Sequence, residues 1–253
     1  MEITAELLIF VFLVGIFAGW VDSIAGGGGL ISLPALLFVG LNPLAALATN
    51  KLQSSFGAFI AAVNYTRLGW VDLQAIRWLV LVAFIASAAG TMLVQHVDLS
   101  LLERLLPVLL GLLAAWFALS PRVGDLERTP RLGGIAYGAT AVPAIGFYDG
   151  FFGPGTGSFF TASAISLLGA SARRAVGLTK VLNFTTNFSS LILFVIGGQV
   201  IWSFGLAMVL GQVIGAWFGS SMAIRNGVAI IRPIVVVVCL AVMIRMLYQQ
   251  YLL

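Results

Sequence analysis

The chain has 253 residues, of which 60% are hydrophobic and only 9% are charged, and its mean hydropathy is +1.09. A typical soluble domain has about 25% charged residues, so this composition excludes a soluble enzyme, a nucleic-acid-binding protein and a disordered regulator. The net charge of +4 does not indicate nucleic acid as a partner, because the arginines fall in short segments between apolar runs. We therefore expect an all-α polytopic membrane protein surrounded by a lipid bilayer. A transmembrane helix needs ~20 residues, so the chain has room for roughly eight or nine segments.

Apolar runs follow one another along the whole chain. They lie at 5–24, 30–39, 43–66, 74–94, 101–120, 132–147, 158–168, 174–197, 200–224 and 229–250. Two of them, 30–39 and 158–168, are only about ten residues long, so as helices they reach about halfway across a ~30 Å hydrocarbon core. Both follow a glycine cluster. The sequence therefore predicts two half-length helices, each preceded by a bend inside the membrane.

The same pattern of special residues occurs twice. Gly19, Asp22, Gly26 and Gly28 recur at constant spacing as Gly146, Asp149, Gly153 and Gly155. After a two-residue insertion, Lys51, Gly69 and Gly90 recur as Lys180, Gly198 and Gly219. Such self-similarity indicates an internal repeat. We expect a first membrane repeat at 1–120, a cytoplasmic linker at 121–131 and a second membrane repeat at 132–253.

The arginines between the apolar runs predict the direction of each half, because positive residues stay on the cytoplasmic side of a membrane. If 1–40 and 131–169 each enter and leave on the same side, Arg104 is the one loop arginine that faces outward. The arginines that then face the cytoplasm are Arg67, Arg77, Arg122, Arg128, Arg131, Arg173, Arg174, Arg225 and Arg232.

This distribution predicts two inverted-topology repeats, each a broken, glycine-rich helical hairpin followed by three transmembrane helices. Both termini then lie on the outer, periplasmic side of the cell inner membrane. Inverted repeats with discontinuous helices are typical of transporters, whose binding site lies near the middle of the membrane where the repeats meet.

Lys51 and Lys180 lie within apolar segments, where a charge costs ~2.5 kcal/mol or more. An unpaired lysine is therefore not expected to face lipid. One interpretation is that each lysine pairs with an aspartate or extends to the membrane interface. The other is that both lysines bind an anion between the halves, and the two interpretations are compatible.

The glycine clusters contribute further candidate residues for binding a substrate. These are Gly26, Gly27, Gly28 and Gly29 in the first half, and Gly153, Gly155, Thr156 and Gly157 in the second. A glycine-rich bend leaves backbone N–H groups and the positive end of a helix dipole at membrane depth. Close helix packing is the alternative. We prefer packing for the small-residue faces Gly15/Gly19 and Gly211/Gly215/Gly219, which also permit a homodimer.

Polar side chains flank both lysines. Asn50 and Ser54 are four residues apart, as are their counterparts Thr179 and Asn183, so each pair shares one face of a helix. Their hydroxyl and amide groups either complete the coordination of an anion or hydrogen-bond across helices, as is common in membranes.

Asp22 and Asp149 precede the two bends. Each is either a structural residue, as a helix cap or the partner of a lysine, or a carboxylate that carries a proton for coupled transport. No cluster of His, Cys, Asp or Glu has metal-ligand spacing, and the chain has one cysteine and one histidine. We therefore expect no enzyme activity, no metal site and no cofactor.

The motifs DSIAGGGG at 22–29 and TNK at 49–51, echoed by DGFFGPGTG at 149–157 and LTK at 178–180, carry a family resemblance. The chain resembles the TauE/SafE sulfite exporter family of bacterial and archaeal membrane transporters, also grouped as toluene-sulfonate uptake permeases, over essentially its whole length. The resemblance implies transport of small sulfur-containing anions such as sulfite, sulfonates or sulfoacetate, driven by the proton gradient.

By position, the resemblance places the site at the glycine bends with Asn50, Lys51, Thr179 and Lys180. The second half departs from the first, because Pro154 interrupts its glycines and LTK replaces TNK, so we expect the two half-sites to contribute unequally.

We therefore predict a secondary membrane transporter of small sulfur-containing anions that is coupled to protons and alternates access between its two repeats. The alternatives are an anion channel or uniporter, and a membrane-embedded accessory protein or enzyme that handles sulfur compounds.

Overall fold

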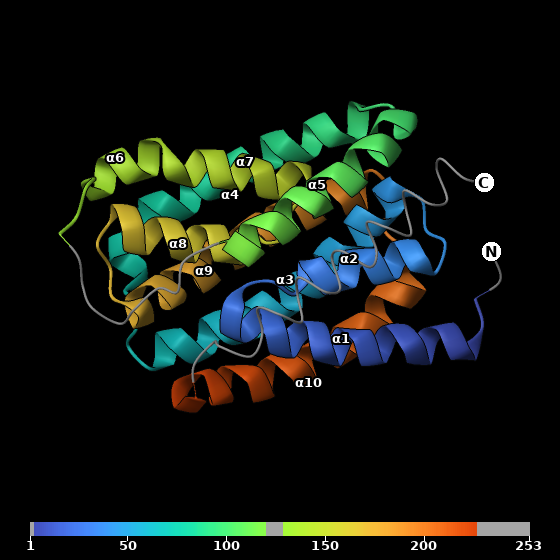
Figure 1. The fold of residues 1–253 in the computed structure, drawn as a ribbon, viewed down its shortest axis with the longest axis horizontal. Coiled ribbons are helices and arrows are strands. Elements are labelled where there is room, and N and C mark those ends of the chain that lie inside the picture. The colour runs from blue at the N-terminus through green and yellow to red at the C-terminus, as the bar shows by residue number, and fades with distance from the viewer. Residues whose placement is uncertain (1–2, 120–128, 227–253) are drawn as a thin grey trace.

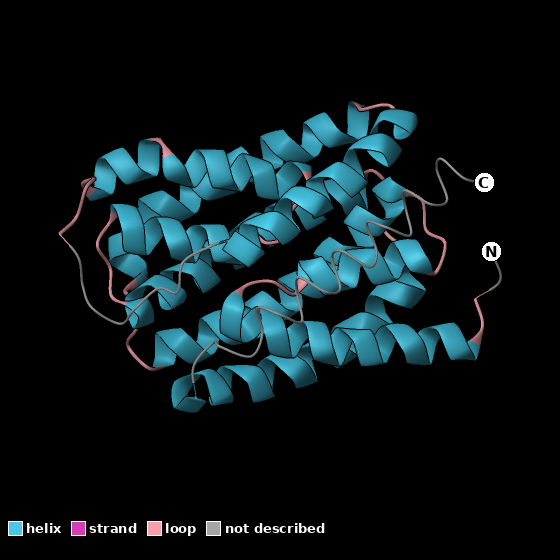
Figure 2. Cartoon of the chain, in the orientation of Figure 1, coloured by secondary structure: helices cyan, strands magenta, loops and turns pink. Residues whose placement is uncertain are grey.

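The computed structural model describes residues 3–119 and 129–226, which form helices joined by short loops (Figures 1 and 2). In chain order the helices are α1 (Ala5–Ala25), α2 (Gly29–Phe38), α3 (Pro43–Arg67), α4 (Leu73–His96), α5 (Leu99–Leu119), α6 (Gly134–Ala139), α7 (Ala141–Phe151), α8 (Thr156–Leu167), α9 (Ala172–Ile196) and α10 (Trp202–Asn226). No strand occurs in these two ranges, which confirms the all-α prediction for them. The apolar run at 229–250 and most of the linker expected at 121–131 lie outside the described residues.

Local sequence signals set where the long helices begin. The side chain of Asn42 accepts a hydrogen bond from Ala45 N at 2.9 Å, and Pro43 is the first residue of α3. Asp72 caps α4 in the same way, accepting from Gln74 N at 2.9 Å. Such side-chain oxygens satisfy N–H groups that the first turn leaves without partners, and a proline there needs no partner.

The two half-length helices are present where glycines end the preceding helix. After α1 the chain turns at Gly26, whose φ of +75° is a left-handed conformation, and α2 then runs for only 10 residues. Before α8, which has 12 residues, Gly155 has a φ of +83°. Residues with a Cβ rarely adopt this conformation. The predicted bends and half-length helices are therefore confirmed.

The apolar run at 132–147 does not form one continuous helix as its counterpart α1 does. It is divided into α6 and α7 at Thr140, whose backbone is not helical (φ −124°, ψ −72°). Pro143 follows in the first turn of α7. Proline has no N–H and its ring clashes with the carbonyl four residues earlier, so Pro143 prevents a regular helix across Ala139.

The two broken hairpins open toward opposite ends of the helix bundle (Figure 1). The pair α1 and α2 opens toward the end where the N-terminus lies, and the pair α7 and α8 opens toward the other end. α1 packs along α10 and α7 packs along α4, while α3 and α9 pack on each other. The hairpin of each sequence half thus lies against a long helix of the other half.

Small residues allow these helix pairs to approach closely. A Cβ on Gly15 would lie 2.6 Å from Met208 O, and one on Gly19 would lie 2.5 Å from Gln212 O, so α1 and α10 contact each other through their backbones. Gly90 and Gly150 play the same role between α4 and α7. Such small-residue contacts are typical of membrane helices, and they confirm the packing role predicted for the face formed by Gly15 and Gly19.

The bundle has an apolar exterior and a polar centre. Four of the described helices are long and apolar enough to cross a membrane, over Ala5–Ile24, Leu73–His96, Ala172–Ile196 and Trp202–Met222. Leu13, Ile85 and Leu210 on these helices are more than half exposed, whereas polar side chains of α3 and α9 are buried. This distribution suits a protein whose solvent is lipid.

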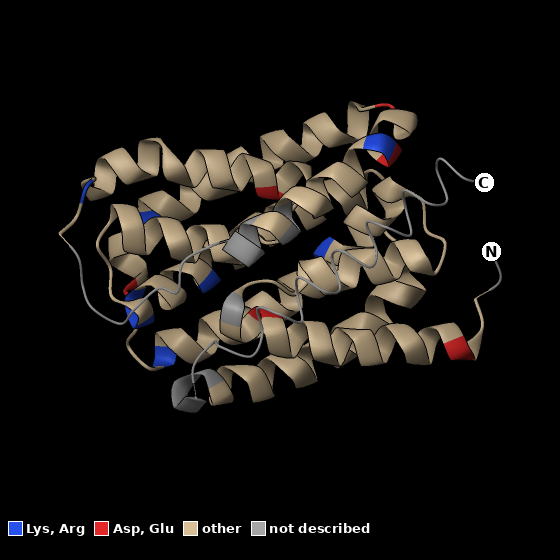
Figure 3. Ribbon diagram, viewed as in Figure 1, with Lys and Arg blue, Asp and Glu red and all other residues tan. Residues whose placement is uncertain are grey.

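Charged residues gather at the two ends of the bundle, and few lie between them (Figure 3). The end opposite the N-terminus carries Arg67, Arg77, Arg131, Arg173 and Arg174, at the termini of α3, α4, α6 and α9.

Candidate functional site

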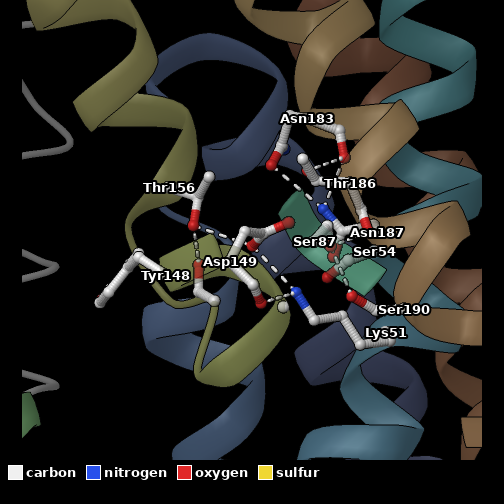
Figure 4. Close-up of polar contacts among 12 residues, drawn as sticks. Lys51, Ser54, Ser87, Tyr148, Asp149, Thr156, Asn183, Thr186, Asn187 and Ser190 are labelled. Carbon is white, nitrogen blue, oxygen red and sulfur yellow. Dashed lines mark hydrogen bonds and ion pairs between the residues drawn. The ribbon is translucent and has the colours of Figure 1, made fainter. Parts of the chain in front are cut away.

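Lys51 of α3 forms a buried ion pair with Asp149 of α7 (Figure 4). Its Nζ lies 2.9 Å from Asp149 Oδ1 and donates a hydrogen bond to the backbone carbonyl of the same residue at 2.5 Å. Both residues are 1% exposed. The ammonium group is thus held by a carboxylate and by a carbonyl at the end of α7, which is the negative end of that helix.

Lys180 of α9 forms the equivalent pair with Asp22 of α1. Its Nζ lies 3.3 Å from Asp22 Oδ2 and also donates to the carbonyl of Asp22. In both pairs the lysine belongs to one sequence half and the aspartate to the other. The prediction that each lysine pairs with an aspartate is confirmed, while binding of an anion remains a prediction.

The ion pairs stabilise the association of the two halves only while both partners are present. A buried charge without its partner costs about 3–5 kcal/mol, and in a membrane water is not available to replace the partner. The two pairs therefore make the contact between the halves specific, because a displaced aspartate would leave a lysine unpaired in an apolar bundle.

The two glycine bends contact each other at the centre of the bundle. A Cβ on Gly26 would lie 2.6 Å from the Cα of Gly157, and one on Gly157 would lie 2.5 Å from the Cα of Gly26. A Cβ on Gly153 would lie 2.7 Å from Lys51 Nζ. Glycine is therefore required here both for the crossing of the backbones and to make room for a lysine head group.

The remaining residues of the bends mainly form the start of the half-length helices. The carbonyl of Gly27 accepts from Leu30 N at 3.0 Å, and the carbonyl of Gly155 accepts from Ser158 N at 2.9 Å. A Cβ on Gly29 would lie 3.2 Å from Pro154 Cα, so this position also brings the two bends together.

Each aspartate also holds the start of the half-length helix that follows it. Gly28 N donates to Asp22 Oδ1 at 3.3 Å. In the second half, Thr156 Oγ1 donates to Asp149 Oδ1 at 2.8 Å and to the carbonyl of Gly153 at 2.6 Å. The predicted capping role is therefore confirmed in a modified form for Asp22, which accepts from a backbone N–H across the bend, whereas Asp149 accepts from a side-chain hydroxyl.

Asn50 and Thr179, which precede the lysines, bind matching partners on the half-length helices. Asn50 Oδ1 accepts from Ser32 Oγ of α2 at 2.5 Å, and Thr179 Oγ1 accepts from Thr161 Oγ1 of α8 at 3.0 Å. The sequence analysis did not single out Ser32 and Thr161. They occupy equivalent positions in the two halves, so an alignment of the halves would have identified them from the sequence.

Ser54 and Asn183 form hydrogen bonds within their own helices. Ser54 Oγ accepts from Gln53 Nε2 at 2.9 Å, and Asn183 Oδ1 accepts from Asn187 Nδ2 at 3.1 Å (Figure 4). Gln53 Nε2 also lies 2.9 Å from Ser32 Oγ and 2.8 Å from Asn50 Oδ1, so its two N–H groups link Ser54 to the network beside Lys51. The predicted hydrogen bonds across helices are therefore found for Asn50 and Thr179, whereas Ser54 and Asn183 bind residues of their own helices.

The described part of the chain contains no group of three or more His, Cys, Asp or Glu side chains that could hold a metal ion. The chemistry available at the centre is therefore that of two lysines, two aspartates and neutral hydrogen-bonding groups.

Discontinuous helices that carry buried ion pairs, enclosed by helices with an apolar exterior, are characteristic of a multi-pass membrane transporter. A sequence model of the family described as sulfite exporter TauE/SafE matches residues 11–246. The chain therefore belongs to the TauE/SafE sulfite exporter family of membrane transporters, as the motifs predicted.

Similar curated proteins carry the same general description. A probable membrane transporter protein of Haemophilus influenzae is 41% identical over 250 residues, which cover 99% of this chain and 98% of the relative. The probable membrane transporter protein YfcA of Escherichia coli is 39% identical, covering 97% of this chain and 91% of the relative. A Sinorhizobium relative, probable membrane transporter protein ORF9, is 42% identical, covering 97% and 94%. No solved structure gives a significant match.

Proposed function

We propose that this protein is a secondary transporter that carries small sulfur-containing anions together with protons. The observation that supports the proposal most directly is the reciprocal pairing of two buried lysines with two aspartates beside the crossing of the glycine bends. A cation that is already held in a membrane by a titratable partner is well suited to exchange that partner for an anionic substrate.

The balance of charge explains why a proton accompanies the anion. In the structure Lys51 and Asp149 together are neutral if both are ionised. When a monovalent anion takes the place of the carboxylate beside Lys51, a proton on the aspartate restores neutrality. Because uncompensated charge is costly at this depth, one proton accompanies each monovalent anion.

A sulfur oxyanion is the substrate class that the family description and the chemistry of the centre support together. The family is described as sulfite exporters. An ammonium group offers three donors, and threonine and asparagine side chains add further donors to oxyanion oxygens. Asn50, Thr179 and the N–H groups of the glycine bends lie on the segments that meet at the centre, and we assign them to substrate binding with Lys51.

Movement of the two halves against each other provides alternating access in this proposal. The halves are taken as inverted-topology repeats, which agrees with hairpins that open toward opposite ends of the bundle. Transporters of this construction expose a central site by rocking one repeat against the other. The arginine-rich end then faces the cytoplasm and the N-terminus faces outward, because positive loops remain inside.

Flux measurements on the pure protein in proteoliposomes test the proposal. Addition of sulfite or a sulfonate is expected to drive accumulation of the anion and movement of protons, followed with an enclosed pH dye. Lys51→Ala should reduce both at least ~10-fold, while the exposed Arg104→Ala should change neither.

Different outcomes identify the alternatives. Currents far above carrier rates would indicate an anion channel, and anion flux without proton movement would indicate a uniporter. Absence of flux until another protein is added would indicate an accessory factor. Normal transport by a well-inserted Lys51→Ala protein would contradict the role of the lysine.

A further inference from the structure

The two buried ion pairs differ in how completely their carboxylates are bound. Both oxygens of Asp22 are occupied, since Oδ2 faces Lys180 and Oδ1 accepts from Gly28 N. In Asp149 both donors bind the same oxygen, because Lys51 Nζ and Thr156 Oγ1 each lie within 2.9 Å of Oδ1. Within the described ranges, Asp149 Oδ2 is buried and has no hydrogen-bond partner.

The surroundings of Asp149 contain few other groups that could hold its charge. Of the helices that pack on α7, α6 and α8 contain no charged residue, and α4 has Arg77 and His96 only near its ends. α9 contributes Arg173 and Arg174 in its first turn and Lys180, whose Nζ binds Asp22. In the part of the chain that the structure describes, Lys51 is thus the single charged group in contact with Asp149.

An ionised carboxylate with one buried, unpartnered oxygen is the less favourable of the two arrangements. Leaving a buried acceptor without a donor is unfavourable, and more so when the acceptor is charged. Adding a proton to Oδ2 removes the charge and converts this oxygen into a donor, while Oδ1 keeps its bond from Thr156. A proton on Asp22 brings no such advantage, because it would compete with Lys180 or with Gly28 N for a carboxylate oxygen that already faces a donor.

We propose that the two pairs have different tasks, and that Asp149 carries the transported proton while Lys180 and Asp22 stay paired throughout transport as a structural ion pair. This assignment rests on the proposed proton-coupled transport and specifies where the proton binds. The proton is taken up on Oδ2 as Lys51 turns from the carboxylate to the anion. The new O–H is then a donor for an oxygen of the same anion, so the loaded site contains Lys51, neutral Asp149 and one monovalent anion.

The isosteric variants Asp149→Asn and Asp22→Asn, compared in proteoliposomes of the full chain, test the assignment. Two quantities are measured for each variant, the protons moved per sulfite and the exchange of radiolabelled sulfite across the membrane. Asp149→Asn is expected to retain exchange but to lose proton movement at least ~10-fold and to become insensitive to pH. Asp22→Asn is expected to lower the thermal stability and the transport rate, while the number of protons per sulfite stays at the wild-type value.

The exposed carboxylate Glu103 provides the matched control, because Glu103→Gln removes the same charge outside the centre and should change neither quantity. Loss of proton movement in Asp22→Asn, or its persistence in Asp149→Asn, would overturn the assignment and leave the proposed function intact. Sulfite flux without proton movement in the wild type would overturn the proton coupling and the assignment together.

A second variant tests the proposal if Asp149→Asn does not fold. Thr156→Val removes the hydroxyl that donates to the oxygen of Asp149 that also faces Lys51. If Asp149 carries the proton, the pH profile of proton-coupled transport should therefore shift. An unshifted profile in a folded Thr156→Val protein would contradict a proton on Asp149.

Discussion

At the residue scale, each lysine is bound by the carboxylate and the backbone carbonyl of one aspartate. Lys51 contacts both groups of Asp149, and Lys180 contacts both groups of Asp22. The aspartate lies in the last turn of α1 or α7. The carbonyl of Asp22 also accepts from Gly26 N at 2.8 Å, so Lys180 is its second donor, whereas Lys51 donates to the carbonyl of Asp149 at the end of α7.

Removal of one member of the Lys180–Asp22 pair should be more destabilising than removal of both. Lys180→Met leaves Asp22 buried without its cation, which costs about 3–5 kcal/mol. The double variant Lys180→Met/Asp22→Asn has no unpaired charge and should recover much of this loss. Thermal unfolding in detergent measures the difference, with Arg104→Met at an exposed position as the control. A double variant that is less stable than Lys180→Met would show that the unpaired charge of Asp22 is not the cause of the loss of stability.

At the element scale, the half-length helices can meet because glycine occupies both sides of the crossing. Gly26 has a positive φ and lies against Gly157. The left-handed turn redirects the chain at membrane depth, and the missing side chains let the two bends contact each other. The same two bends place Asp22 and Asp149 beside the lysines of the opposite half.

Comparing Gly26→Ala with Gly69→Ala separates the cost of a positive φ for alanine from the cost of a steric clash between an added methyl group and the opposite bend. Both glycines have similar φ values, +75° and +72°, but a Cβ on Gly69 meets nothing within 4 Å. Gly69→Ala should cost only the conformational penalty of about 1–2 kcal/mol. Gly26→Ala should cost clearly more, because its methyl group would enter the backbone of Gly157.

The apparent Tm in detergent and the folded fraction on size-exclusion chromatography provide the comparison for these two variants. Equal losses for Gly26→Ala and Gly69→Ala would show that the contact between the bends is not required for the fold.

At the scale of the whole molecule, positive residues concentrate at one end of the bundle (Figure 3). Arg67 ends α3 at this end, whereas Glu103 lies near the start of α5 at the other, and both are exposed. If the arginine-rich end faces the cytoplasm, the two positions lie on opposite sides of the membrane.

Cysteine labelling tests this orientation. In a chain whose single cysteine is replaced (Cys239→Ser), Glu103→Cys should react with a membrane-impermeant maleimide on intact spheroplasts. Arg67→Cys should react only after the membrane is opened. The reverse pattern would invert the proposed orientation.

A cross-link between the halves should stop transport if they move against each other. Ser87 of α4 and Ser190 of α9 belong to different halves, and their hydroxyl oxygens are 2.8 Å apart (Figure 4). Two cysteines at these positions therefore have their side chains within reach of each other, as a disulfide requires.

In the Cys239→Ser background, oxidation of Ser87→Cys/Ser190→Cys should abolish sulfite exchange and reduction should restore it. The two single-cysteine proteins should be unaffected by either treatment. Full exchange by the cross-linked protein would exclude relative movement of α4 and α9 during transport.

Several features of the fold were predictable because they depend on neighbouring residues. The half-length helices follow from short apolar runs after glycines, and the burial of Lys51 and Lys180 follows from the apolar segments that contain them. The interruption at Thr140 was not predicted, since hydropathy alone does not register the missing N–H of Pro143.

By itself, the sequence determined the helical class, the two bends, the membrane-embedded charges and the family, because composition, glycine positions and motifs are properties of short segments. Only the tertiary structure decided which aspartate meets which lysine, that Ser32 and Thr161 bind Asn50 and Thr179, and that Asp149 has an unpartnered oxygen. These contacts join segments far apart in the chain. They depend on how α1, α3, α7 and α9 pack around the crossing of the bends, and no local pattern of residues specifies that packing.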